Sequence, residues 1–241
     1  MSGAAVELKG LSRRYGHLYI LKEINLSVGR GKTVALVGGN GAGKTTLLRV
    51  LATTLRPSRG SGKVFGFDLS SEAPEVRKRV AYLGVLGGSY GALTATENLR
   101  LAATLYGKDA SHGRLAALLR RVGLQGAKDK PARVFSSGMK KRLALARLLL
   151  ADAPLLLLDE PYAALDESGK GLIDEVLAEA KLQEKTVVMA SHELERITPL
   201  TDSVLQLQEG RLSLAGAAFR GVKDMLEDGV AGDGVAGDGV A

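Results

Sequence analysis

The sequence has 241 residues, of which 45% are hydrophobic, and this is enough chain for one large α/β domain or two small ones. It contains no cysteine, which excludes disulfides and thiolate metal sites and makes a reducing cytoplasm the natural compartment. The first residues lack an apolar signal segment, and no stretch reaches the roughly 20 apolar residues of a membrane span. We therefore expect a protein that is neither exported nor inserted in a membrane.

The formal net charge is +7, and a basic surface suits anionic ligands, nucleic acid or an anionic membrane face. A solvated basic surface with no specific partner is the alternative. Aromatic residues make up 4% of the chain and tryptophan is absent, so stacking platforms for single-stranded nucleic acid are scarce. We expect no nucleic-acid partner.

Strands and helices alternate along the chain. Alternating apolar residues predict half-buried strands at 6–8 and 24–28, and the apolar segment 33–37 predicts a buried strand. A helix is predicted at once afterwards, over 45–55, and it stops before Pro57. Further strands are predicted at 60–67, 155–158, 186–190 and 204–207.

The segment 94–147 is predicted to be mostly helical, with inward-facing candidates at Leu99, Leu105, Leu115, Leu118, Leu119 and Val122. This order of elements indicates an α/β fold with a mainly parallel central sheet, an N-terminal antiparallel β part and an inserted α-helical subdomain at roughly 88–147.

The last residues repeat a five-residue unit of Asp, Gly, Val and Ala that has no periodicity able to build a core. We expect a domain over residues 1–226, followed by a low-complexity, disordered tail at 227–241. Repeated Asp-Gly pairs are also found in calcium loops, but this spacing matches none of them.

A glycine-rich segment between the apolar strand at 33–37 and the following helix fits the P-loop pattern G-x-x-x-x-G-K-[ST]. Its backbone N–H groups would surround phosphate oxygens, and the helix dipole would add positive potential. Lys44 would reach the β- and γ-phosphates, and Thr45 would hold Mg²⁺. The predicted nucleotide-binding residues are Gly38, Gly39, Asn40, Gly41, Ala42, Gly43, Lys44, Thr45 and Thr46.

A run of leucines ends on Asp159, Glu160 and Pro161, and buried strands do not tolerate paired carboxylates unless a nearby site needs negative charge. A strand beside the P-loop strand would bring both acids to the phosphates, as in a Walker B motif. Asp159 would then bind Mg²⁺, and Glu160 would act as general base on the attacking water. The alternative, that both acids cap a turn, does not explain their pairing with a P-loop.

A basic helix precedes the leucine strand. Ser136 is a candidate N-cap, and Lys140, Lys141 and Arg142 follow in the first turns, the unfavourable end of a helix for cations. The charges suggest an anion or acidic partner, with a solvated basic face as the alternative.

In order along the chain, these motifs resemble the nucleotide-binding subunit of ATP-binding cassette (ABC) transporters, through about residue 226. The segment FSSGM at 135–139 resembles the family signature and retains Ser136 and Gly138. Asp166 lies in a segment similar to the D-loop, and His192 ends a strand as the family's switch histidine does. Tyr15 stands where the family stacks an aromatic on adenine, although a tyrosine beside glycine is also a common turn residue.

The resemblance implies ATP and Mg²⁺ as cofactors and a head-to-tail homodimer with ATP at its interface. Glu160, His192 and Lys44 would be the catalytic residues, whereas Ser136 and Gly138 would serve the partner's nucleotide and Asp166 would couple the two sites. An integral membrane permease would be the second partner, which implies a cytoplasmic protein peripheral on the inner face of the membrane.

One position departs from the family pattern. Val85 stands where the family places a glutamine that touches Mg²⁺ and water. Valine can do neither, so hydrolysis is expected to be slow or dependent on a partner.

The residues around Tyr82 and the segment SSGMKKRLALARLLL are most similar to the haem-exporter ATPase of the cytochrome c maturation system. This resemblance implies a role in haem export. Other exporters of drugs, lipids or polysaccharides, non-transport ABC ATPases and a weakly catalytic nucleotide-dependent regulator remain alternatives.

Overall fold

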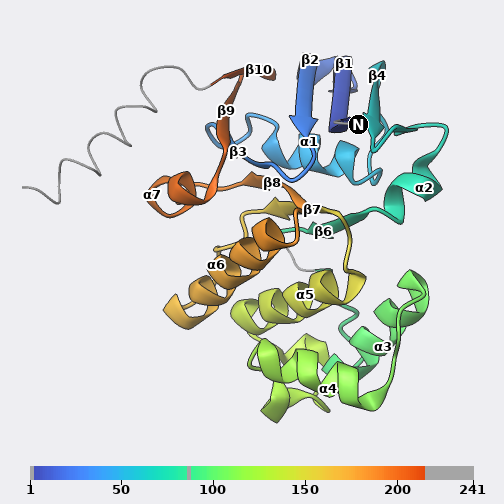
Figure 1. Cartoon of the computed structure of the whole chain (residues 1–241), viewed down its shortest axis with the longest axis vertical. Helices are drawn as coiled ribbons and strands as arrows, with labels where there is room; N and C mark the ends of the chain where they lie inside the picture. The colour runs from blue at the N-terminus through green and yellow to red at the C-terminus, as the bar shows by residue number, and fades with distance from the viewer. Residues whose placement is uncertain (1–2, 86–87, 215–241) are drawn as a thin grey trace, which may run out of the picture.

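The computed structural model describes residues 3–85 and 88–214, which form two β-sheets and a set of helices (Figure 1). The first sheet is antiparallel, with strand order β2-β1-β4-β5. Its strands are β1 (Ala4–Tyr15), β2 (Leu18–Gly29), β4 (Arg59–Val64) and β5 (Phe67–Asp68).

The second sheet has six strands in the order β10-β9-β3-β8-β7-β6. All its neighbouring strands run parallel except β10, which is antiparallel to β9. Its strands are β3 (Thr33–Val37), β6 (Val80–Leu83), β7 (Leu155–Asp159), β8 (Thr186–Ala190), β9 (Ser203–Gln208) and β10 (Arg211–Leu214). The predicted α/β fold with a mainly parallel central sheet is confirmed.

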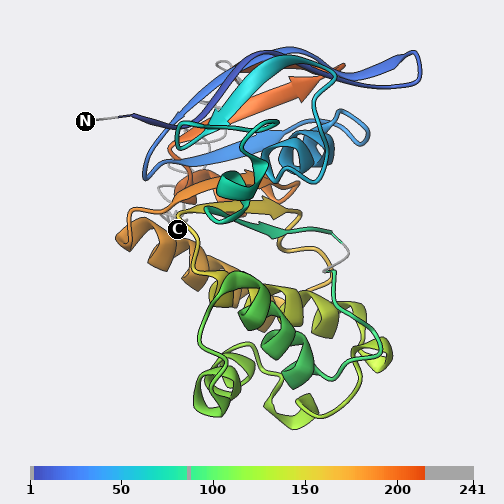
Figure 2. The same ribbon diagram turned by 90° about the vertical axis from the view of Figure 1, so that its right-hand side faces the viewer.

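The helices lie on both sides of the parallel sheet. Figure 2 shows α1 between the two sheets, α5 and α6 on the opposite face, and α3 and α4 beyond α5. The helices are α1 (Lys44–Leu51), α2 (Ala73–Arg77), α3 (Ala95–Tyr106), α4 (His112–Arg121), α5 (Ser137–Ala151), α6 (Glu167–Leu182) and α7 (Leu194–Ile197). Short 3₁₀ helices lie at Gln125–Ala127, Ala132–Val134 and Thr198–Leu200.

The leucine run in β7 is buried because helices cover both faces of the sheet. Leu155 and Leu157 pack in the hydrophobic cluster that includes α1 and the antiparallel sheet, whereas Leu156 and Leu158 pack in the cluster formed with α3, α5 and α6. Successive side chains of a strand point to opposite faces, so a strand covered on both faces is apolar at every position. The carboxylates therefore follow directly at the end of the strand.

The prediction that Leu105 points inward is wrong, because its side chain is 68% exposed. Leu99 is buried with Ala102 and Ala103, at the i, i+3 and i+4 positions of one helix face. Leu105 follows Leu99 by six residues, or about 240° of rotation, so it lies away from that face. Of the other candidates, Leu115, Leu119 and Val122 are buried, and Leu118 is partly buried.

Several predicted elements differ in extent. The strands predicted at 6–8 and 24–28 extend over Ala4–Tyr15 and Leu18–Gly29. The helix predicted over 45–55 ends at Leu51, and Thr53 adopts a positive φ of 56° that no helix continues through. The strand predicted over 60–67 is a hairpin, because Phe65 and Gly66 both have positive φ and turn the chain between β4 and β5.

The described helices include none that is both long and apolar enough to cross a membrane. The predicted tail at 227–241 lies outside the described residues, and the predicted domain limits remain predictions.

Candidate nucleotide site

The P-loop connects β3 to α1 at the carboxyl edge of the parallel sheet. Gly38 has a φ of 151°, and a Cβ at this position would lie 2.1 Å from the Leu207 carbonyl oxygen of β9. Only glycine therefore allows the loop to leave the sheet here. Gly43 caps α1 in the left-handed conformation, so α1 begins at Lys44 with free N–H groups.

Lys44 is 7% exposed, and its ammonium lies inside the loop. Its Nζ donates to the carbonyl oxygens of Gly38 at 2.6 Å and Gly39 at 3.2 Å. The Nε2 atom of His192 lies 3.4 Å from the same Nζ. The loop therefore holds a positive charge beside its own backbone and next to the end of β8.

Asp159 ends β7 with a side chain that is 1% exposed. The Thr45 hydroxyl donates to one carboxylate oxygen at 3.1 Å, and the Tyr82 hydroxyl donates to the other at 3.1 Å. Burial, and secondly the charge of Asp159, raise the pKa of Tyr82 to about 12, so Tyr82 remains a donor at neutral pH. A buried carboxylate beside a threonine hydroxyl is a donor set that fits Mg²⁺, which prefers oxygen ligands.

Glu160 adopts a positive φ of 46° directly after β7, which turns its side chain towards the end of β8. Its backbone N–H donates to the Ala190 carbonyl at 2.9 Å, and the His192 N–H donates to Oε2 at 3.3 Å. Oε1 lies 3.2 Å from His192 Nε2, but the geometry makes no hydrogen bond, and this buried oxygen has none within the described residues. Glu160 therefore lies beside His192 at the ends of β7 and β8, where a carboxylate can act as a general base.

A cavity of about 550 Å³ lies in front of the loop. It brings together most of the predicted site residues from four separate segments of the chain. Its lining consists of Tyr15, Ile20, Gly39, Asn40, Gly41, Ala42, Gly43, Lys44, Thr45, Thr46, Glu160, Ala163 and His192.

Ser136, Gly138 and Asp166 are not among the described residues that line this cavity. The Ser136 hydroxyl accepts from the Met139 N–H at 3.2 Å and caps α5, as predicted. A Cβ on Gly138 would lie 2.9 Å from the Ala164 carbonyl oxygen, so the start of α5 packs closely against the loop before α6.

Asp166 caps α6 through the Gly169 N–H at 3.0 Å and accepts from Arg142 Nη2 at 2.7 Å. The Arg142 hydrogen bond, followed by the Gly169 N–H, holds the pKa of Asp166 below its usual value. These contacts join the N-terminal ends of α5 and α6 at a second location, separate from the P-loop cavity.

Two of the three basic residues predicted at the start of α5, Lys141 and Arg142, have side-chain partners within the chain. Lys141 is 3% exposed, which excludes a solvated face at this position. Sequence reasoning missed the burial of Lys141 and the contact of Tyr82 with Asp159. The spacing of Lys141 to Leu145 and Leu148, four and seven residues on, is the helical signal that places it on the buried face.

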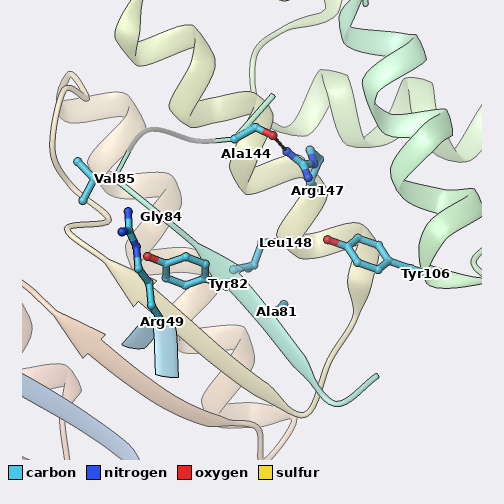
Figure 3. Close-up of a pocket in the computed structure, with 10 residues that line it drawn as sticks. Arg49, Ala81, Tyr82, Gly84, Val85, Tyr106, Ala144, Arg147 and Leu148 are labelled. Carbon is cyan, nitrogen blue, oxygen red and sulfur yellow. Dashed lines mark hydrogen bonds between the residues drawn. The ribbon is translucent and has the colours of Figure 1, made fainter. Parts of the chain in front are cut away.

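Val85 follows β6 on the rim of a smaller cavity of about 280 Å³ between the sheet and the helices (Figure 3). Its side chain is 47% exposed. Arg49 and Tyr82 line the sheet side of this cavity, and Tyr106 and Arg147 line the helix side. Arg147 donates to the Gly88 carbonyl oxygen.

The prediction that the strand ending on Asp159 lies beside the P-loop strand is wrong, because β8 lies between β3 and β7 and pairs with both. A glycine loop between a buried parallel strand and a helix, with a carboxylate at the end of another strand of the same sheet, is typical of P-loop nucleoside triphosphatases. Comparison with known families then gives the narrower assignment, since residues 21–163 match the family model described as ABC transporter. The chain belongs to the ABC transporter family, as one of its ATP-binding and ATP-hydrolysing subunits that power transport.

Named relatives support this assignment. The ABC transporter ATP-binding protein NatA of Bacillus subtilis is 35% identical over 82% of this chain and 81% of its own length. The cytochrome c biogenesis ATP-binding export protein CcmA of Methylococcus capsulatus is 39% identical over 80% and 93%, respectively. The daunorubicin/doxorubicin resistance ATP-binding protein DrrA of Streptomyces peucetius is 33% identical over 88% and 65%.

A solved structure described as the ATP-binding subunit of an ABC transporter has a similar fold. It superposes with a TM-score of 0.81 at 29% identity, covering 95% of this chain and 100% of its own.

Proposed function

We propose that this chain uses Mg²⁺ and ATP in the cavity in front of the P-loop, and that it powers an exporter as a head-to-tail homodimer bound to an integral membrane permease. The observation that supports this most is the convergence of Lys44, Thr45, Asp159, Glu160 and His192 from three strand ends on one site.

The phosphates are held by the chain's own groups. The P-loop N–H groups and the start of α1 face the cavity, and Lys44 neutralises the phosphate oxygens. Thr45 and Asp159 would hold Mg²⁺, which when bound neutralises charge that develops on the phosphates. Tyr15 lines the cavity and is 49% exposed, so its ring can serve as a stacking surface for adenine. The Arg13 guanidinium lies 4.7 Å from the ring centre.

Hydrolysis requires a water molecule to lose a proton as it attacks the γ-phosphate. Glu160 takes up this proton, since it is a carboxylate residue that lines the cavity beside His192. His192 orients Glu160 through its backbone N–H and places its ring between Glu160 and Lys44.

We infer the dimer from two predicted site residues that do not line the P-loop cavity. Ser136 and Gly138 lie at the start of α5 and do not line the cavity of their own chain. In a head-to-tail dimer they would face the partner's ATP, with free N–H groups of the helix N-terminus directed at the phosphates. Asp166, next to them through Arg142, would then lie at the interface.

The smaller cavity beside Val85 is the surface we assign to the permease. It lies between the parallel sheet and the helical group, and Tyr106 and the nearby Leu105 are exposed there. Binding at this position would place the chain on the cytoplasmic side of the membrane as a peripheral subunit.

For the cargo, we propose haem in cytochrome c biogenesis, supported by the 39% identity to CcmA over nearly its whole length. Export of another compound, such as a drug, is the alternative, supported by the 33% identity to DrrA. Deletion of the gene should remove haem-stained c-type cytochromes, with rescue by the wild-type gene and not by Glu160→Gln. Normal cytochromes together with lost resistance to an anthracycline would favour the drug alternative.

A weakly catalytic regulator is a second candidate, favoured by the absence of a polar group at Val85. Mg²⁺-dependent hydrolysis by wild type and Val85→Gln, each with and without permease-containing membranes, separates the two. Wild-type turnover that the permease stimulates supports the transporter motor. Turnover by Val85→Gln alone supports the regulator.

A further inference from the structure

Lys141 is a buried cation outside the P-loop cavity. It lies on α5, and its side chain is 3% exposed between that helix and the parallel sheet. A buried ammonium group is unfavourable unless hydrogen bonds and opposite charges replace its hydration. Its partners therefore indicate what the residue does.

The ammonium group bonds to the backbone at two neighbouring strand ends. It donates to the Asp159 carbonyl oxygen at 3.2 Å and to the Gly84 carbonyl oxygen at 3.4 Å. Asp159 is the last residue of β7, and Gly84 directly follows β6, whose Leu83 pairs with Leu158. One side chain thus spans two strands at the edge where the site lies.

The charge of Lys141 is also close to the acids of the site. Burial lowers the pKa of Lys141 to about 8, while the negative charges of Asp159 and Glu160 act in the opposite direction and favour the ammonium. Lys44 belongs to α1, on the other face of the sheet from α5 (Figure 2). The two carboxylates therefore have a buried lysine on each side of the sheet.

We propose that Lys141 is a positioning residue for ATP hydrolysis, which fixes the ends of β6 and β7 to α5 and so holds Asp159 and Glu160 in register with the P-loop. Lys141 is not among the described residues that line the P-loop cavity, and it acts through the backbone of Asp159. Because Val85 supplies no polar side chain beside Gly84, this backbone tether is a second polar link between the end of β6 and the site, in addition to the hydrogen bond from Tyr82 to Asp159. The inference rests on the proposed roles of Asp159 and Glu160.

A purely space-filling role of Lys141 predicts a different result from a positioning role. Lys141→Met leaves the Asp159 and Gly84 carbonyl oxygens without this donor, which lowers stability whatever the role of the lysine. If Lys141 only fills space, the folded variant should still hydrolyse ATP at the wild-type rate. A positioning lysine gives a folded protein with a reduced rate, because a displacement of about 1 Å in a catalytic group costs roughly 100-fold.

The experiment compares the full chain with Lys141→Met and Lys141→Arg, and uses Lys181→Met, an exposed position on α6, as the matched control. We expect kcat of Lys141→Met to fall about 10- to 100-fold. ATP affinity without Mg²⁺ should stay near wild type, Tm should fall by only a few degrees, and more Mg²⁺ should be needed for the half-maximal rate. Lys141→Arg, which retains charge and donors, should recover most of the loss, and Lys181→Met should match wild type.

Wild-type kcat in Lys141→Met would overturn the proposal, and so would a loss of rate that only parallels losses in Tm and ATP affinity. If Lys141→Met does not fold, Lys141→Gln is measured in its place by the same criteria. Glu160→Gln separates this inference from the proposed function. An inactive Glu160→Gln with an active Lys141→Met refutes only the role of Lys141, whereas an active Glu160→Gln refutes the assigned site.

Discussion

The P-loop end of α1 and the N-terminal end of α5 are both helix starts beside an acidic residue, yet their surroundings differ. At α1, Lys44, Glu160 and His192 converge on a cavity within the same chain. At α5, Ser136 caps its own helix, and Arg142 pairs with Asp166 at the start of α6. The first region contains the groups for chemistry, whereas the second presents a helix N-terminus without such groups.

We propose from this difference that one chain contains two incomplete halves of a site. In this proposal the cavity in front of α1 binds phosphate and activates water, and the α5 start of another chain completes it. The start of α5 has free N–H groups and a close approach to the loop before α6, where a Cβ on Gly138 would lie 2.9 Å from Ala164. Changes in the two regions should therefore separate binding, chemistry and assembly.

The largest expected effect is on the chemical step. Glu160→Gln removes the proton acceptor and keeps the size of the side chain, so hydrolysis should fall about 10²- to 10⁴-fold. ATP binding should persist, and a closed dimer should accumulate, which size-exclusion chromatography with ATP would detect. A monomeric variant with wild-type turnover would contradict the role of Glu160.

A smaller effect is expected on phosphate binding. Lys44→Ala removes a charged donor worth about 1.5–3 kcal/mol, so ATP affinity should fall roughly 10- to 100-fold. Fluorescent nucleotide titration measures this, with Lys181→Ala as a control on the exposed surface. Unchanged affinity in Lys44→Ala would mean that the P-loop is not the phosphate site.

Substitutions at the start of α5 should lower the rate of ATP hydrolysis without changing the affinity of the same chain for ATP. Ser136→Ala removes a hydroxyl that would bind the partner's ATP, and loss of one hydrogen bond worth about 1 kcal/mol should lower kcat about fivefold, while ATP affinity of the monomer stays the same. Ser137→Ala, one residue further on, is the matched control. A loss of monomer affinity in Ser136→Ala would place Ser136 in its own chain's site.

The smallest expected effect concerns acid stability at Asp166. Because the folded-state pKa is lowered from 3.8, chiefly by Arg142, the ionised carboxylate stabilises the fold above pH 3.8, and this contribution is lost as pH falls through the lower folded value. Asp166→Asn should make stability less dependent on pH in that acidic window. Urea unfolding at several pH values tests this, and an unchanged pH slope would argue against the Arg142 contact.

The local pattern of apolar and turn residues in the sequence predicts much of the fold. The bounds of β3 and β8 match their predicted ranges, because both are apolar segments bounded by turn residues. The P-loop and the carboxylates after β7 also follow from local residue types. The strands β6 and β10 have four residues each and were not predicted, since so short a segment gives little periodicity.

Contacts between distant segments were not predictable from pattern. Tyr82 and Asp159 are 77 residues apart and meet because β6 and β7 are neighbours in the sheet. Lys141 was grouped with Lys140 and Arg142 as a basic cluster, whereas its burial depends on how α5 packs on the sheet. Leu105 shows the reverse error, because an apolar residue off the packed face remains exposed.

The most direct test of the proposal that two chains share each ATP site is to mix two defective variants. Lys44→Ala has an intact α5 start, and Ser136→Glu has an intact P-loop, so a head-to-tail mixed dimer contains one complete site. We predict that each variant alone is nearly inactive and that the mixture hydrolyses ATP at a substantial fraction of the wild-type rate. If both variants fold and no mixing ratio restores hydrolysis, the site is not shared between two chains and the account is wrong.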